Sequence, residues 1–437
     1  MKNRFLKNTS WIFLGNILKA IFAFGLNIIT ARYLSVENFG LINYTVSIVV
    51  LFSSISSLGL TAVITKFFAQ DEKNTSIYLS TGIILRIFIG IISIVGIQCV
   101  IRNSDNAGSK MANILFFQSL SIVFSTFDLF NFWFRYKYNA KFVVIVRFIG
   151  FGVSAIVRII SIVVFRNIIL YSIGLSLESF VISGFLFVEY KKRNSFKFIF
   201  NAEKAKYMLK ISYPFIFSGI LTSIYGQIDK FMLKSMINTI SVGNYSVAMT
   251  LAGAFSIIPV ALREAFQPEI MRYKVENTII YKRRLRQLYA TTFWSSFIYC
   301  VIVTIFAKVI ILILYGERYI DAIPVLSLVV WYSSFSYFGG INNLYLVAEN
   351  KTFWVQLLSS IGVVLNIVLN FILIQKYSAV GAALASLITQ FVANFLMLII
   401  IPTLREGFYI MFQGILCKDI GLKEMINYLK RRKNDKL

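Results

Sequence analysis

Long runs of mostly apolar residues recur along the whole 437-residue chain, with short charged segments between them. A helix needs roughly 20 such residues to cross the hydrocarbon core of a bilayer. The sequence predicts twelve spans, at 10–30, 40–65, 77–101, 112–134, 142–165, 168–189, 211–236, 241–262, 288–314, 320–347, 353–374 and 379–402. Because 58% of the residues are hydrophobic and only 14% are charged, a water-soluble fold could not bury them. We therefore expect an all-α polytopic membrane protein.

Several kinds of chemistry are excluded by composition. The chain has no histidine, so it holds neither a Ser-His-Asp triad nor a His-ligated metal. Its three cysteines, Cys99, Cys300 and Cys417, are far apart in sequence, which fits packing better than a disulfide framework or a zinc site. We expect no metal and no cofactor.

The basic residues predict the orientation in the membrane. If the N-terminus is cytoplasmic, the inside segments carry 31 Lys and Arg residues and the outside loops carry 6. By the positive-inside rule both termini lie in the cytoplasm. The net charge of +25 then reflects topology and attraction to anionic lipids, rather than nucleic-acid binding.

A polar segment from Lys191 to Lys210 divides the spans into two sets of six. The similar tetrapeptides at 43–46 and 244–247 are 201 residues apart, which indicates a duplication. We expect six-helix lobes at 1–196 and 197–402, related by a pseudo-twofold axis along the membrane normal. Residues 403–437 are expected to form a basic, amphipathic cytoplasmic tail.

Ten charged residues lie inside the predicted spans, two or more positions from either end. They are Lys19, Arg86, Arg147, Arg158, Lys230, Lys234, Lys308, Asp128, Glu178 and Asp229. Each charge facing lipid near the bilayer centre would cost about 2.5 to 3.5 kcal/mol. These side chains must therefore face a hydrated cavity or one another.

Helical spacing supports a shared cavity, although each charge has an alternative role. Arg147 and Arg158 are eleven residues apart, which places them about 20° apart in azimuth and roughly 16 Å apart along one helix. Lys234, Lys308 and Arg147 could instead extend to the membrane surface. Asp229 could pair with a neighbouring base, and Glu178 could neutralise an arginine.

An excess of positive charge in such a cavity favours anions, because guanidinium and ammonium groups bind phosphate strongly. An exporter of hydrophobic cations would need acids there. Serines are concentrated in the second span, where they could bind a sugar, although helix packing explains them better. They are Ser47, Ser53, Ser54, Ser56 and Ser57.

Short motifs at matching span ends resemble those of one known family. They are Asn8-Thr9-Ser10-Trp11, Ala31-Arg32-Tyr33-Leu34-Ser35 with Asn38-Phe39-Gly40, Asp229, Val242-Gly243-Asn244-Tyr245 and Gly381-Ala382-Ala383-Leu384. Together they resemble the polysaccharide-unit flippases of the multidrug/oligosaccharidyl-lipid/polysaccharide exporter superfamily. The resemblance covers nearly the whole chain and implies two six-helix lobes around a central cationic cavity.

This resemblance implies a transporter, not an enzyme. Its substrate would be an oligosaccharide repeat unit, for O-antigen or capsule, linked to undecaprenyl pyrophosphate and moved to the outer leaflet of the bacterial inner membrane by alternating access. Other implied partners are membrane lipids, H+ or Na+ as coupling ion, and polymerase and chain-length regulator proteins. Two alternatives stay open: a polymerase or ligase enzyme acting on the same lipids, and a drug/cation antiporter.

The site residues follow from both lines of reasoning. The expected substrate-binding cations are Lys19, Arg32, Arg86, Arg147, Arg158 and Lys230, with a lysine at position 19 where the family suggests an arginine. The candidates for ion coupling are Asp128, Glu178 and Asp229.

Overall fold

The computed structural model describes residues 2–102, 109–137, 139–194 and 196–416. Within these ranges all regular structure is helical. Among the described residues, nine helical stretches are long and apolar enough to cross a membrane, and a tenth arises if one bent pair counts as a single span. The predicted class, an all-helical multi-pass membrane protein, is confirmed.

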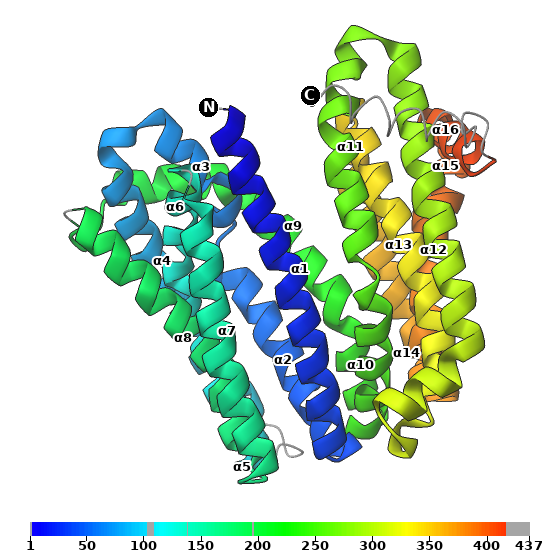
Figure 1. The fold of residues 1–437 in the computed structure, drawn as a ribbon, viewed down its shortest axis with the longest axis horizontal. Helices are drawn as coiled ribbons and strands as arrows, with labels where there is room; N and C mark the ends of the chain where they lie inside the picture. The colour runs from blue at the N-terminus through cyan, green and yellow to red at the C-terminus, as the bar shows by residue number, and fades with distance from the viewer. Residues whose placement is uncertain (1, 103–108, 138, 195, 417–437) are drawn as a thin grey trace. The chain divides into compact units, whose positions relative to one another are not determined.

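The chain divides into two compact units, Met1–Ser246 and Val247–Leu437. The elements of the first unit are α1 (Lys2–Tyr33), α2 (Val36–Ser56), α3 (Leu60–Gln70), η1 (Glu72–Asn74), α4 (Thr75–Arg102), α5 (Ser109–Phe124), η2 (Ser125–Asp128), α6 (Leu129–Tyr136), α7 (Ala140–Val163), α8 (Ile168–Arg193) and α9 (Ala202–Met236), together with the first half of α10 (Thr239–Ala254). In this unit α8 packs against α7 and α5, and α1 packs against α7 (Figure 1). The boundary expected at 196/197 separates two sets of six predicted spans, whereas the boundary at 246/247 separates two compactly packed units. The two-lobe division at 196/197 stays a prediction.

Two spans of the first unit are interrupted. Between α2 and α3, Leu58 and Gly59 have positive φ angles of 51° and 61°. A Cβ on Gly59 would lie 2.8 Å from the carbonyl oxygen of Ser212 on α9, so only glycine permits this turn beside α9. Between α5 and α6 the short 3-10 segment η2 ends at Asp128, and such breaks within a span often accompany a functional residue.

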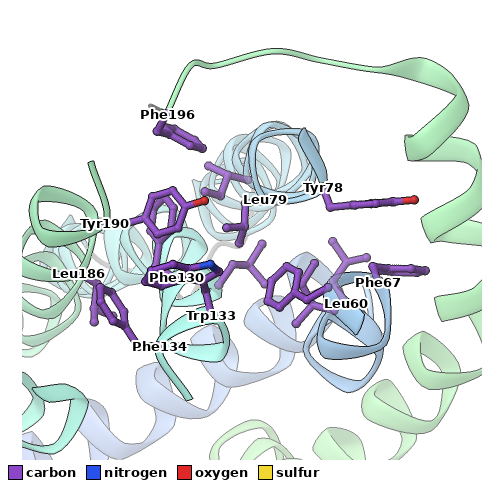
Figure 2. Packing of buried hydrophobic residues seen from close by; sticks show 14 of the residues in the cluster. Leu60, Phe67, Tyr78, Leu79, Phe130, Trp133, Phe134, Leu186, Tyr190 and Phe196 are labelled. Atoms are coloured by element: carbon purple, nitrogen blue, oxygen red, sulfur yellow. The ribbon is translucent and has the colours of Figure 1, made fainter. Parts of the chain in front are cut away.

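An aromatic cluster joins α3, α4, α6 and α8 to the segment that precedes α9 (Figure 2). The rings of Phe130 and Tyr190 have centroids 4.6 Å apart, and those of Trp133 and Tyr190 are 4.8 Å apart. Phe196 lies over this group, with its ring 5.4 Å from that of Phe130. Such pairs contribute about 0.5 to 1.5 kcal/mol each beyond the burial of their area.

The segment that links α8 to α9 is hydrogen-bonded to α4. The Ser80 hydroxyl donates to the carbonyl of Ile199 at 2.9 Å and accepts from the amide of Ile199 at 2.6 Å. The amide of Asn201 donates to the Thr81 hydroxyl at 3.2 Å. The link between the two predicted halves is therefore part of the first unit.

The elements of the second unit are the end of α10, then α11 (Ile257–Glu276), α12 (Thr278–Leu314), η3 (Glu317–Tyr319), α13 (Ala322–Ala348), α14 (Thr352–Phe391), the π-helical turn η4 (Val392–Leu396), α15 (Met397–Ile400), η5 (Pro402–Leu404) and α16 (Arg405–Ile415). Helices α10 and α11 form the bent pair, at an angle of 42°. Pro259 lies in the first turn of α11, directly after this break, where proline fits a helix best.

Helix α14 contains an internal break at Ser378, which has a φ of 50° and a ψ of −128°. This residue lies between the eleventh and twelfth predicted spans. Helix α16 forms the start of the predicted tail, and it packs on α12, where Gly414 lies against Arg286 and Tyr289, while Gly407 lies against Tyr345 of α13. The basic end of the tail, together with Cys417, lies outside the described residues.

Candidate functional site

A carboxylate in the first unit lies between two predicted cations. Lys19 Nζ on α1 is 2.6 Å from Glu178 Oε1 on α8. Arg158 Nη2 on α7 is 4.0 Å from Glu178 Oε2. We call Lys19, Arg158 and Glu178 the Glu178 group. Helix α1 and the consecutive helices α7 and α8 thus bring two positive charges to one negative charge.

The pocket around Arg158 is aromatic and tight. The Arg158 guanidinium lies 5.7 Å from the ring centroid of Phe151 and 6.0 Å from that of Tyr171, and Lys19 Nζ lies 6.0 Å from the Phe151 ring. A Cβ at position 174 would lie 2.7 Å from Arg158 Cγ, which is too close. The absence of a side chain at Gly174 therefore makes space for the Arg158 side chain. Aromatic faces stabilise a cation without neutralising it. The site can therefore keep its positive charge while partly desolvated.

Arg158 is only partly satisfied. Its Nε donates to the carbonyl of Ser154 at 3.4 Å, whereas Nη2 has no hydrogen-bond partner within the described part of the chain. The whole residue is 7% exposed. A buried guanidinium with unused donors is ready to bind an anion, because charge-assisted hydrogen bonds are among the strongest available.

A second group, again of two cations and one acid, contains Asp128 at the end of η2. Arg147 Nη2 on α7 lies 3.1 Å from both Oδ1 and Oδ2 of Asp128. Asp128 also interacts electrostatically with Arg86 on α4. Arg86 is 5% exposed, and its Nε and Nη1 have no partner among the described residues. We call Arg86, Arg147 and Asp128 the Asp128 group.

The two groups together hold four cations and two acids. Of the alternatives for Arg147 and Glu178, the structure favours ion pairing. Pairing by two acids nevertheless leaves an excess of two positive charges on α1, α4 and α7. This excess is the property that an anion-binding site needs.

The remaining predicted residues lie elsewhere in the first unit. Asp229 is buried on α9 and accepts a hydrogen bond from the Tyr245 hydroxyl of α10, so two of the sequence motifs meet here. Lys230, the next residue, is half-buried beside Asp229. Arg32 is exposed at the C-terminal end of α1, about 20 Å along the helix from Lys19. None of these three belongs to the Glu178 or Asp128 group.

The sequence analysis missed the residues that shape the site around Arg158. Phe151 and Tyr171 carry no signal in an apolar helix, since most aromatics in such a helix pack against lipid or core. Gly174 is one of 24 glycines, and nothing in its local sequence marks it. A helical wheel of α7 could have found Phe151, because it lies seven residues before Arg158 and thus on nearly the same face.

Fold and site together define a class: a multi-pass, all-helical membrane protein with a partly desolvated, cation-rich interior. Comparison with known proteins agrees. The structure is similar to that of a lipid II flippase, MurJ, in an inward closed conformation, with a TM-score of 0.71, 18% identity and coverage of 94% of this chain and 93% of that one. It is also similar to an inward-facing multidrug resistance MATE transporter of the MOP superfamily, with a TM-score of 0.66, 14% identity and coverage of 88% and 95%.

The sequence comparison identifies the family. The model of the polysaccharide biosynthesis protein family matches residues 5–274, more than half of the chain, and the chain belongs to this family. A curated relative, the capsular polysaccharide biosynthesis protein CapF of Staphylococcus aureus, is 23% identical over 401 residues, covering 89% of this chain and 97% of the relative. The family match and the curated relative bear out the expected link to polysaccharide biosynthesis, and the chain shares the fold of the flippase and transporter structures.

Proposed function

We propose that this protein is a flippase for lipid-linked oligosaccharides. It would move repeat units attached to undecaprenyl pyrophosphate from the cytoplasmic to the outer leaflet of the bacterial inner membrane. The observation that carries the proposal is the pair of charge groups in the first unit, each with two cations on one acid. The family match and the flippase-like fold support it.

Without substrate, the two acids would pair with the cations that bind the pyrophosphate when it is present. In the Glu178 group, the carboxylate pairs with two cations, which would be costly to bury without a negative partner. An arriving pyrophosphate carries more negative charge and can take over these contacts, since arginine accommodates phosphate oxygens in two parallel hydrogen bonds. Protonation of Glu178 or Asp128 would have the same effect as displacement. This gives H+ a route to influence substrate affinity, and Asp229 is a third candidate.

The two groups would bind the substrate in succession. Arg147 and Arg158 are roughly 16 Å apart along α7, much farther than one pyrophosphate can bridge. In the predicted orientation Arg147 lies nearer the cytoplasm. A substrate that enters from that side would meet the Asp128 group first and the Glu178 group second.

Twelve spans in two lobes remain our proposal for the membrane topology. Helix α14 has 40 residues, about 60 Å, which is twice the hydrocarbon thickness, so its break at Ser378 would separate two spans. The nine stretches of the described residues become ten when α14 is divided, and the bent pair and α9 would bring the number to twelve. An even number of spans would place both termini on the same side, which we propose is the cytoplasm. Alternating access would then rock the lobes around a cationic central cavity. Polymerase and chain-length regulator proteins would act on the delivered units.

Deletion of the gene tests the function. We expect lipid-linked repeat units to accumulate on the cytoplasmic leaflet, measured by labelling the sugar and probing its accessibility in right-side-out and inside-out vesicles. Unpolymerised units on the outer leaflet would instead identify a polymerase or ligase. Normal surface polymer together with hypersensitivity to cationic drugs would identify an antiporter.

A further inference from the structure

A cavity of about 470 Å³ lies within the first unit, between α2, α5, α8 and α9. Its polar lining consists of six serines and Gln118, and its apolar lining consists of three valines and a leucine. No charged residue lines it among the described residues. We call this cavity the serine pocket. Its volume lies within the range of about 300 to 1,000 Å³ that is usual for small-molecule sites.

Gln118 shows that the serine pocket is more than helix packing. The residue is 2% exposed, yet neither Oε1 nor Nε2 has a hydrogen-bond partner in the described part of the chain. The hydroxyl of Ser54, across the pocket on α2, is unpartnered in the same sense. Leaving a buried polar group unsatisfied costs about 1 to 3 kcal/mol. A polar ligand that enters the pocket would recover this free energy.

The serine pocket adjoins the Glu178 group. Ser179 of α8 lines the pocket and directly follows Glu178, so their Cα atoms are about 3.8 Å apart. Consecutive residues of a helix point about 100° apart. The pocket and the cations Lys19 and Arg158 therefore lie on neighbouring sides of α8. An anion held by these cations can place an attached neutral group in the pocket.

The chemistry of the lining selects the kind of group. Serine hydroxyls and a glutamine amide both donate and accept hydrogen bonds, as sugar hydroxyls do. The valines of α2 offer an apolar surface for the C–H face of a sugar ring. We propose that the serine pocket binds the sugar that is directly attached to the pyrophosphate. This inference rests on the proposed function and adds a carbohydrate subsite to it.

Binding by two lipids tests the subsite. One is undecaprenyl pyrophosphate, and the other is the lipid-linked saccharide extracted from the gene-deletion strain. Binding to the purified full-length protein in nanodiscs is measured for the wild type and for Gln118→Leu, Ser179→Leu and Arg158→Ala. Ser119→Ala on α5 is the matched control, because Ser119 is fully buried, bonds the carbonyl of Phe116 and does not line the pocket.

We expect the wild type to bind the saccharide-bearing lipid more tightly than undecaprenyl pyrophosphate. Gln118→Leu and Ser179→Leu should weaken binding of the saccharide-bearing lipid about tenfold and leave binding of undecaprenyl pyrophosphate within twofold of wild type, which also shows that the variants are folded. Arg158→Ala should weaken both, and Ser119→Ala neither. Unchanged binding of the saccharide-bearing lipid by both pocket variants overturns the subsite and leaves the flippase proposal intact. A deletion strain that accumulates no lipid-linked saccharide overturns both.

Discussion

Lys19 and Glu178 are 159 residues apart in sequence, and their side chains meet with 2.6 Å between Nζ and Oε1. This pair joins α1 to α8, while Arg158 of α7 approaches the same carboxylate from another direction. Neutralising Glu178 therefore leaves both Lys19 and Arg158 without this negative partner. The arrangement links the stability of the first unit to the charge that is available for a substrate.

A double-mutant cycle on Lys19→Met and Glu178→Gln should give a coupling free energy of about 1 kcal/mol. Residues in contact commonly give coupling free energies of about 0.5 to 3 kcal/mol. We expect a value in the lower part of this range because the Lys19 side chain is 36% exposed and solvent screens its charge. Thermal unfolding in one detergent provides the measurement. Strict additivity of the two single variants would mean that the contact has no energetic weight.

Arg158→Ala and Arg86→Ala should each lower flipping of the lipid-linked saccharide about tenfold or more, because a charge-assisted hydrogen bond contributes about 1.5 to 3 kcal/mol. Arg158→Lys should restore little, since lysine cannot form two parallel bonds to phosphate. Surface polymer in a complemented deletion strain is the readout. Lys308→Ala, at an exposed position of α12, serves as the control. Wild-type polymer in both arginine variants would exclude these residues from the binding site.

Gly174→Ala should impair transport without removing any charge. The added Cβ would lie 2.7 Å from Arg158 Cγ, and the guanidinium would have to leave its place between Phe151 and Tyr171. Gly184→Ala on the same helix meets nothing within 4 Å and should keep activity. Equal activity of the two variants would show that Arg158 tolerates displacement. Protein amounts in the membrane are compared by immunoblot.

Gly40→Ala should destabilise the first unit by about 1 to 3 kcal/mol, the usual cost of overpacking. Its Cβ would fall 1.8 Å from the carbonyl oxygen of Thr239, a backbone atom of α10 that cannot rotate away. Gly25→Ala, with open space around the new Cβ, is the matched control. The melting temperatures of the two purified variants are compared, and a melting temperature for Gly40→Ala equal to that of the control would contradict this close helix contact.

Asp71 should make the stability of the first unit depend on pH. Hydrogen bonds from the Asn74 side chain and from Lys204 hold the pKa of the Asp71 carboxyl below its ordinary value. A lowered folded-state pKa means that the stabilisation is complete above the unfolded value of about 4 and is lost as pH falls through the folded value. Melting temperatures between pH 3 and 7 should therefore drop less steeply for Asp71→Asn. Asp321→Asn, at an exposed carboxylate of the second unit, is the control, and an identical profile for Asp71→Asn and wild type would refute the prediction.

The sequence predicted the class of fold because hydrophobic runs of membrane length are a direct consequence of bilayer thickness. It also named Lys19, Arg86, Arg147 and Arg158, together with Arg32 and Lys230, as candidate substrate-binding cations, and that role stays a prediction. It could not pair them with particular acids, since Glu178 and Asp128 reach their partners only through packing of α7 against α8 and η2. The role of Gly174 was hidden for the same reason: the steric space it leaves exists only after α7 and α8 pack together.

Helix boundaries were harder to predict where spans are broken. Leu58 has a positive φ although leucine rarely adopts one, so nothing in its local sequence predicts the turn between α2 and α3. The bend between α10 and α11 lies directly before Pro259, in the first turn of α11. Helix α9 fails the hydropathy test for a span, and Asp229, Lys230 and Lys234 give its C-terminal half three charges.

The hydrogen bonds from Ser80 and Thr81 have a consequence for any movement of the protein. Segment 196–201 lies within the polar stretch from Lys191 to Lys210 that separates the two predicted halves, where a hinge would be expected. Its anchoring to α4 and the burial of Phe196 instead make it travel rigidly with the first unit. The flexing that a rocking mechanism demands must then be accommodated by other parts of the backbone.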